Sequence, residues 1–177
     1  RLTPAELRDQ VNLLFIAGHE TTVNLIGTGI YELLRHPEQA AIWRGDPELD
    51  ATAVDEMLRF VSPVQFSRRI TLDDIDFQGT TIPKGMFVLA GLASSNHDPK
   101  KWGHTAEELD VRRDGAGQHL SFGSGAHYCL GASLAKLEAA IAIGTFLRRF
   151  PDAAVSGDVE WNGRINLRGL EYLPVTL

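Results

Sequence analysis

The sequence predicts a mainly α-helical fold that carries a few small β-sheets. Two long segments, residues 4–34 and 130–150, are rich in apolar and small residues and stop at prolines, as helices do. Short β-type runs separated by turn signals occupy residues 64–88, and strand-like pieces return in the tail. No repeat, low-complexity segment or block of like charge divides the chain, so these elements are expected to share one domain.

The composition is that of a soluble globular protein. Hydrophobic residues make up 44% of the 177 residues and charged residues 23%, which suffices for a real core. The formal net charge of −6 argues against nucleic acid as the main partner. The single cysteine cannot form an internal disulfide, so a reducing, cytoplasmic setting is expected. No signal peptide or bilayer-spanning apolar run is evident, so no membrane partner is expected.

The first helix is expected to be very long. Thr3 can cap it, Pro4 suits its first turn, and Glu6 completes a capping box. Apolar residues then continue to Leu34, and the dipeptide His36-Pro37 ends the helix. This predicts roughly 30 residues of helix, about 45 Å long at 1.5 Å per residue.

The remaining elements follow in order. Short helices are predicted over residues 37–44 and 49–61, the second closed by Ser62-Pro63. After the β-type region, residues 96–118 are polar and contain several turn-forming Gly and Pro residues, which predicts a winding loop with a helical turn or two. The helix over residues 130–150 comes next, and short strands complete the chain to Leu177.

A polar interruption divides the apolar residues of the first helix. The interruption is Ala17-Gly18-His19-Glu20-Thr21-Thr22, in which Gly18 costs about 1 kcal/mol relative to Ala in a helix interior. The Thr21 hydroxyl can bond back to the carbonyl of Ala17 and loosen the helix. One interpretation is a proton-delivery site in which Glu20 and Thr21 link solvent to a reacting group. The other is a helix whose polar face meets solvent.

Glu56 and Arg59 lie three residues apart on one predicted helix face. Such a pair is usually an exposed ion pair worth a few tenths of a kcal/mol. The pair indicates a more important role only if a second arginine from elsewhere in the chain completes a buried network with it.

The cysteine lies in a loop with three glycines, Phe122-Gly-Ser-Gly-Ala-His-Tyr-Cys129-Leu-Gly131. A loop with so few side chains leaves room for another group, which a lone structural cysteine does not explain. The helix that follows points its free N–H groups toward Cys129 and stabilises a thiolate, a good soft ligand for iron. A four-thiolate iron–sulfur cluster is excluded within this chain, whereas a thiolate-ligated haem needs only one cysteine.

Together, these motifs resemble those of the cytochrome P450 family of haem-thiolate monooxygenases. The family's cysteine loop, its helical Glu-x-x-Arg and its oxygen-binding helix signature all occur here, in the family's order and spacing, and the resemblance covers the whole chain. The matching residues are Phe122, Gly125, Cys129 and Gly131; Glu56 and Arg59; and Ala17, Gly18, Glu20 and Thr21. Arg113 looks like the arginine that completes the Glu–Arg network, with Arg112 as a close competitor. The tail around Arg168-Gly169-Leu170 is similar to soluble bacterial members.

The resemblance implies roles for these residues. Cys129 is implied to be the proximal ligand of the iron of haem b (iron protoporphyrin IX), and its electron-rich thiolate promotes cleavage of the O–O bond. Thr21 and Glu20 are implied to assist the protonation of dioxygen. Arg69 and His127 match positions that pair with haem propionates, for which a guanidinium is well suited.

Other residues are implied to shape the cofactor site or hold it together. Glu56, Arg59 and Arg113 are implied to be structural and to hold the cysteine loop. The further residues implied to border the haem are Phe122, Gly123, Gly125, Gly131, Ala17 and Gly18. Substrate contacts are expected near Phe15–Gly18, Val61–Phe66 and Leu170–Tyr172.

The implied reaction inserts one oxygen atom of O2 into a small, largely apolar substrate. The implied electron donors are a ferredoxin and its NAD(P)H-dependent ferredoxin reductase. Two alternatives stay open. A haem-thiolate peroxygenase or isomerase does not need the Glu20–Thr21 pair, and a haem-free scaffold or activator does not need Cys129.

Length is where the chain departs from the family. A full member is more than twice as long, and this chain begins just before the oxygen-binding helix. The resemblance therefore implies that residues 1–177 are the C-terminal part of a single domain whose N-terminal half is absent. We expect the isolated fragment to bind haem weakly or not at all and to lack monooxygenase activity.

Overall fold

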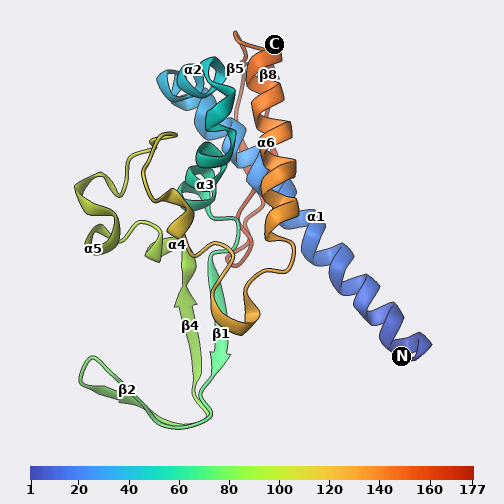
Figure 1. The fold of residues 1–177 in the computed structure, drawn as a ribbon, viewed down its shortest axis with the longest axis vertical. Coiled ribbons are helices and arrows are strands. Elements are labelled where there is room, and N and C mark those ends of the chain that lie inside the picture. The colour runs from blue at the N-terminus through green and yellow to red at the C-terminus, as the bar shows by residue number, and fades with distance from the viewer.

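A computed structural model describes all residues, 1–177. Four helices form its centre, with the long helix α1 (Pro4–Arg35) beside α6 (Ala132–Arg149) and with α3 (Asp50–Val61) and α2 (Pro37–Gly45) packed against them (Figure 1). Small strands and short helical turns surround these helices. The predicted class, mainly α with small β-sheets, is confirmed.

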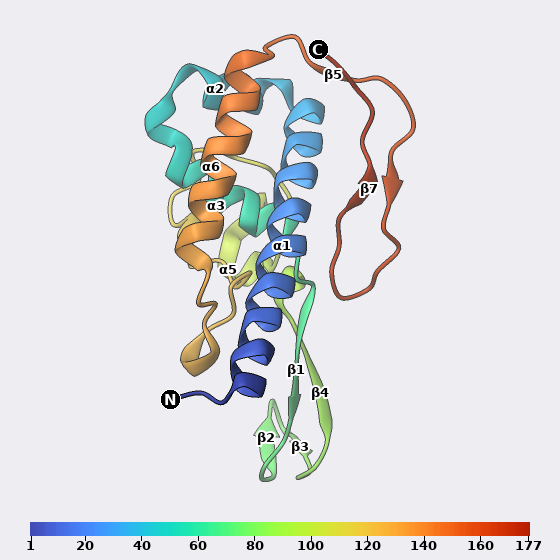
Figure 2. The ribbon, with the colours of Figure 1, turned by 90° about the vertical axis from the view of Figure 1, so that its right-hand side faces the viewer.

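Helix α1 is a single uninterrupted helix of 32 residues, about 48 Å long at 1.5 Å per residue. The Thr3 side chain accepts from the backbone N–H of Glu6, and the Glu6 carboxylate accepts from the N–H of Thr3, which is the predicted capping box. Its N-terminal half projects past the other helices and is exposed on all sides, whereas its C-terminal half enters the core (Figure 2). One helix therefore joins the packed interior to an open surface.

The core lies where the C-terminal half of α1 meets α2, α3 and α6. Trp43 and Met57 are fully buried in it, and the Trp43 indole N–H donates to Asp50 Oδ1 at 2.7 Å. The cluster has 13 members: Leu25, Leu33, Ala40, Trp43, Ala53, Val54, Met57, Leu58, Leu109, Val111, Ala139, Ile143 and Leu147. The glycine at position 29 belongs to this packing, because a Cβ there would lie 3.0 Å from Ile143.

All strands pair as two-stranded antiparallel sheets. The pairs are β1 (Phe66–Ile70) with β4 (Phe87–Gly91), β2 (Ile75–Phe77) with β3 (Thr80–Ile82), β5 (Ala154–Val155) with β8 (Val175–Thr176), and β6 (Glu160–Trp161) with β7 (Leu170–Tyr172). The β1–β4 ribbon extends away from the helices and carries β2 and β3 at its far end (Figure 1). Arg69 is opposite Val88 in this ribbon.

The segment between β4 and α6 winds over α3 in short turns. It contains α4 (Leu92–Ser95), α5 (Pro99–Trp102) and three 3-10 turns, η2 (Gly103–Thr105), η3 (Ala116–Gln118) and η4 (Gly125–His127). The expected winding loop is present, with more helical turns than predicted. Helix α6 begins at Ala132 rather than at the predicted residue 130, because the backbone turns through Gly131 and the Ala132 N–H bonds to the Cys129 carbonyl.

The chain exposes 11242 Å² of surface. A compact protein of 19.4 kDa is expected to expose about 8,500 Å², so the excess is about 2,700 Å². Much of it is apolar: Leu13, Leu14, Phe15 and Ile16 on α1 are each more than half exposed. Surface of this kind normally contacts another polypeptide or a ligand. No helix combines the length and apolar content that a membrane span requires.

Candidate haem-thiolate site

The cysteine loop is held by its own backbone. The Cys129 N–H donates to the Phe122 carbonyl at 3.0 Å and closes the loop at its base. Gly123 and Gly125 have φ angles of 71° and 72°, the left-handed region that favours glycine. A Cβ at Gly123, Gly125 or Gly131 would meet no atom within 4 Å, so these glycines border open space.

Cys129 is exposed at the end of this loop, between Tyr128 and Leu130, which are 53% and 89% exposed. An exposed thiol with exposed apolar neighbours is unusual for a structural cysteine, which is normally buried. The arrangement leaves the sulfur accessible to an incoming metal.

The polar interruption of α1 keeps its helical geometry. The Thr21 hydroxyl donates to the Ala17 carbonyl at 2.8 Å, the bond that the sequence suggested, and the helix continues through Gly18. A Cβ on Gly18 would meet no atom within 4 Å. Glu20 forms an ion pair with Arg164, which lies between β6 and β7. Sequence reasoning missed this partner, because 144 positions separate the two residues.

Glu56, Arg59 and Arg113 form one buried network. Arg59 Nε and Nη2 donate to the two Glu56 carboxylate oxygens at 2.7 and 2.8 Å, and both side chains are fully buried. Arg113 Nε donates to Glu56 Oε1 at 3.1 Å, so Arg113 rather than Arg112 closes the network. The exposed pair that the spacing alone favoured is therefore the wrong interpretation for Glu56 and Arg59.

The two residues expected at the haem propionates have no partners from distant parts of the chain. Arg69 Nη1 contacts only the neighbouring Ser67 Oγ, at 2.5 Å, and the Arg68 carbonyl, at 2.7 Å. His127 is exposed within η4. Both side chains are free to bind an anionic group, and neither is committed to the core.

The residues present fit an iron porphyrin. Its iron needs a soft axial ligand, which the accessible Cys129 thiolate provides. Its flat macrocycle needs apolar surface and close backbone approach, which the exposed apolar residues of α1 and the open glycine positions offer. No group of three or more His, Cys, Asp and Glu residues could hold a bare metal ion instead.

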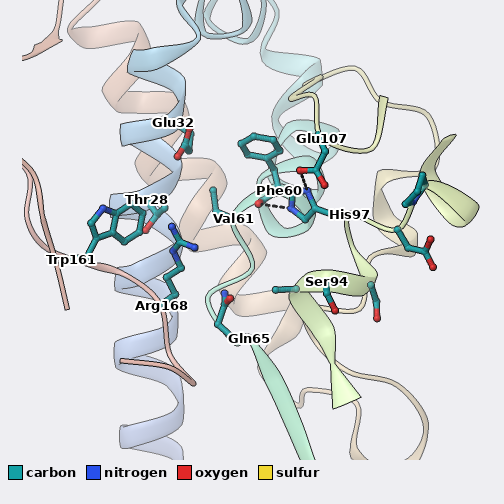
Figure 3. Close-up of a pocket in the computed structure, with 14 residues that line it drawn as sticks. Thr28, Glu32, Phe60, Val61, Gln65, Ser94, His97, Glu107, Trp161 and Arg168 are labelled. Atoms are coloured by element: carbon teal, nitrogen blue, oxygen red, sulfur yellow. Dashed lines mark hydrogen bonds and ion pairs between the residues drawn. The ribbon is translucent and has the colours of Figure 1, made fainter. Parts of the chain in front are cut away.

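A separate groove of about 610 Å³ lies on the C-terminal side of α1 (Figure 3). It contains none of the residues predicted to bind or border the haem, but it is lined by Val61 and Gln65, from a segment expected to contact substrate. On one side the guanidinium of Arg168 lies 4.4 Å from the ring centroid of Trp161. On the other, His97 contacts the Phe60 carbonyl at 3.0 Å and Glu107 at 3.1 Å. This groove therefore does not coincide with the cysteine loop.

Sequence reasoning also missed a group of polar residues behind the cysteine loop. The Asp55 carboxylate on α3 contacts His119 Nε2 and Lys136 Nζ. On the winding segment, Asn96 Nδ2 donates to the hydroxyls of Ser62 and Ser121. Taken singly, these residues form no recognisable spacing in the sequence. Only the polar character of the stretch before Phe122 could have drawn attention to them.

Comparisons with known proteins show which family the chain belongs to. A sequence model described as "Cytochrome P450" matches residues 48–162, well over half of the chain. Cytochrome P450 monooxygenase PikC of Streptomyces venezuelae is 45% identical over 99% of this chain and 42% of its own length. Vitamin D(3) 25-hydroxylase of Pseudonocardia autotrophica is 44% identical over 100% of this chain and 44% of its own length.

Solved structures show the same relationship. P450BioI, crystallised in complex with an acyl carrier protein ligated to hexadec-9Z-enoic acid, superimposes with a TM-score of 0.96 at 45% identity. That match covers 100% of this chain and 46% of P450BioI. The chain spans less than half the length of the relatives that it matches. Because the family model matches well over half of the chain and the fold superimposes on that of a solved P450 structure, the chain belongs to the cytochrome P450 family.

Proposed function

We propose that residues 1–177 are the C-terminal part of one haem-thiolate monooxygenase domain. The observation that carries this proposal is the exposed thiol of Cys129. The backbone N–H of Cys129 donates to the Phe122 carbonyl, and the glycines of the loop border open space. The excess exposed surface, and matched relatives of more than twice this length, support a partner region that packs on α1. The isolated fragment is expected to bind haem weakly or not at all and to be inactive.

The proposed reaction is R–H + O2 + 2 e⁻ + 2 H⁺ → R–OH + H2O. The electrons come from NAD(P)H through a ferredoxin reductase and a ferredoxin in the cytoplasm. When bound, haem b supplies the redox chemistry for dioxygen, and its thiolate ligand donates electron density that favours O–O cleavage.

The chain's own residues supply position and protons. The Phe122 carbonyl fixes the Cys129 amide and so sets where the sulfur lies. The Thr21 hydroxyl, anchored on the Ala17 carbonyl, holds a proton at Oγ1 beside the open surface at Gly18. Glu20 can replace that proton from solvent, because its carboxylate is partly exposed. This pair favours the monooxygenase over a peroxide-using enzyme, which has no need of proton delivery to dioxygen.

Arg69 and His127 are proposed to bind the haem propionates, since both are exposed and uncommitted to other ion pairs. The substrate is proposed to be a largely apolar organic molecule. Exposed apolar residues of α1 adjoin the Thr21 site. The names of three relatives, a polyketide biosynthesis P450, a vitamin D(3) 25-hydroxylase and a complex carrying hexadec-9Z-enoic acid, all indicate apolar substrates.

The absorbance spectrum of the reduced, carbon-monoxide-bound full-length protein tests the proposal. We expect the band shift that is specific to thiolate-ligated haem, and we expect Cys129→Ala to abolish it. Thr21→Ala should keep the shift but consume NAD(P)H without forming product. A full-length protein that binds haem without the thiolate shift would refute the assignment of Cys129.

A further inference from the structure

A partly buried cluster of titratable side chains lies behind the cysteine loop and connects three elements. Asp55 comes from α3, His119 from the segment after η3, and Lys136 from α6. Lys136 Nζ lies 2.6 Å from Asp55 Oδ1, and His119 Nε2 lies 3.5 Å from the same oxygen. The side chains of His119 and Asp55 are 2% and 19% exposed. The Lys136 side chain is 35% exposed, so the cluster runs from the buried His119 ring outward to the surface.

The hydrogen bonds of His119 fix its tautomer. Its Nδ1 accepts the backbone N–H of Ser121 at 3.1 Å, so Nδ1 carries no proton. The ring proton is therefore on Nε2, which is buried, forms no hydrogen bond and lies 3.5 Å from Asp55 Oδ1. The imidazole thus links a carboxylate on α3 to the backbone immediately before Phe122.

The same cluster contacts Phe122 directly. The His119 ring centroid lies 5.5 Å from that of Phe122, and Lys136 Nζ lies 6.0 Å from the Phe122 ring centroid. The Phe122 carbonyl in turn accepts the N–H of Cys129. A continuous set of contacts therefore runs from α3 and α6 through Phe122 to the cysteine.

We propose that Asp55, His119 and Lys136 are positioning residues for the Cys129 thiolate. This inference rests on the proposed haem-thiolate function and goes beyond it by assigning residues that touch neither cofactor nor substrate. Without the cluster, Phe122 and the carbonyl that anchors Cys129 can shift. A displaced sulfur would be less well placed to bind the iron, and contacts behind a metal ligand tune the properties of the bound metal.

The test uses the full-length holoprotein with Asp55→Asn and His119→Phe. The matched control is Asp50→Asn, since Asp50 also joins α3 to α6 through an ion pair, with Arg148 at 3.1 Å, but is the first residue of α3 and is not part of the cluster. We expect Asp55→Asn and His119→Phe to speed loss of the thiolate-type carbon monoxide spectrum by about tenfold and to raise the haem reduction potential. Asp50→Asn should change neither. His119→Gln, whose amide can still donate to Asp55, should recover part of the loss.

Amide hydrogen exchange of the haem-free full-length protein gives a readout that does not need the cofactor. Exchange at the Cys129 amide should become about tenfold faster in Asp55→Asn and remain unchanged in Asp50→Asn. Equal effects of the two aspartate variants on spectrum and exchange, or no effect of either, would overturn the positioning role. Failure of the proposed function differs from both outcomes, because the unmodified protein would then lack the thiolate-type spectrum.

Discussion

Replacing Arg59 by alanine is the most severe single test of how this fold is held together. The guanidinium has five N–H donors, and the structure provides five acceptors for them. Two are the Glu56 oxygens, and the others are the carbonyls of Asn96, Ala106 and Glu108, at 2.7 to 2.8 Å. Arg59 therefore joins α3 to the winding segment that leads to the cysteine loop.

The loss of unfolding free energy expected for Arg59→Ala follows from the burial of the pair. Arg59 and Glu56 are fully buried, and removing one partner of a buried pair costs about 3–5 kcal/mol because the other charge stays uncompensated. Arg113 remains bonded to Glu56 and limits the loss toward the lower part of this range. Arg59→Lys keeps the charge but offers three donors in place of five, so an intermediate loss is expected.

The chain contains a matched control with the same spacing. Glu32 and Arg35 form a second Glu-x-x-Arg pair, 3.3 Å apart, but the Arg35 side chain is 55% exposed. Arg35→Ala should therefore cost only about 0.2–0.5 kcal/mol.

Guanidinium unfolding of the full-length protein, followed by circular dichroism, measures both free energies. A difference of less than about 1 kcal/mol between Arg59→Ala and Arg35→Ala would refute the argument that burial decides the contribution.

Three further predictions follow from other contacts. Gly169→Ala should lower the unfolding free energy by about 1–3 kcal/mol, because its Cβ would overlap the buried Asn24 side chain, and adding Asn24→Ala should restore part of the loss in the same unfolding assay. Burial raises the pKa of Asp55, but the contacts of its carboxylate with His119 and Lys136 outweigh this and leave the pKa lowered. The stabilisation that ionised Asp55 provides is therefore complete above its unfolded-state pKa and is lost as pH falls through its folded-state pKa. The unfolding free energies of the protein and of Asp55→Asn, measured by urea titration, should converge as pH falls from about 6 to about 3. A constant difference between them would contradict this. Arg164→Gln should lower the free energy of unfolding by less than about 1 kcal/mol, because its ion pair with Glu20 is exposed. A larger loss in the same unfolding assay would contradict this.

The helices were predictable because their signals are local. The capping box of α1, the proline after it and the proline after α6 each act within a few residues, so the expected ends lie close to the observed ones. The short turns η2, η3 and η4 were not individually predictable. The η3 turn packs on α3, and the carbonyls of Ala106 and Glu108, between η2 and η3, accept from Arg59; such dependence on distant residues leaves no local pattern.

The two Glu-x-x-Arg pairs show why the site could be predicted only in part. Residues 32–35 and 56–59 have the same residue types, spacing and helical setting, and local reasoning assigns both the same small energy. The two pairs differ because the Arg59 guanidinium also donates to three backbone carbonyls, which lie 37, 47 and 49 residues further along the chain. Resemblance to a family identified the second pair, but only the fold gives its physical reason.

The cysteine loop combines both kinds of information. Its glycines are required locally, because positions 123 and 125 have positive φ, and this could be inferred from the sequence as room left for another group. Its surroundings are not local, since Phe122 packs against His119, whose ring lies 3.5 Å from an aspartate on α3. A loop with three glycines has little stiffness of its own. A thiolate that must stay in one position therefore needs support from rigid helices, and the two that reach it are α3, through Asp55, and α6, through Lys136.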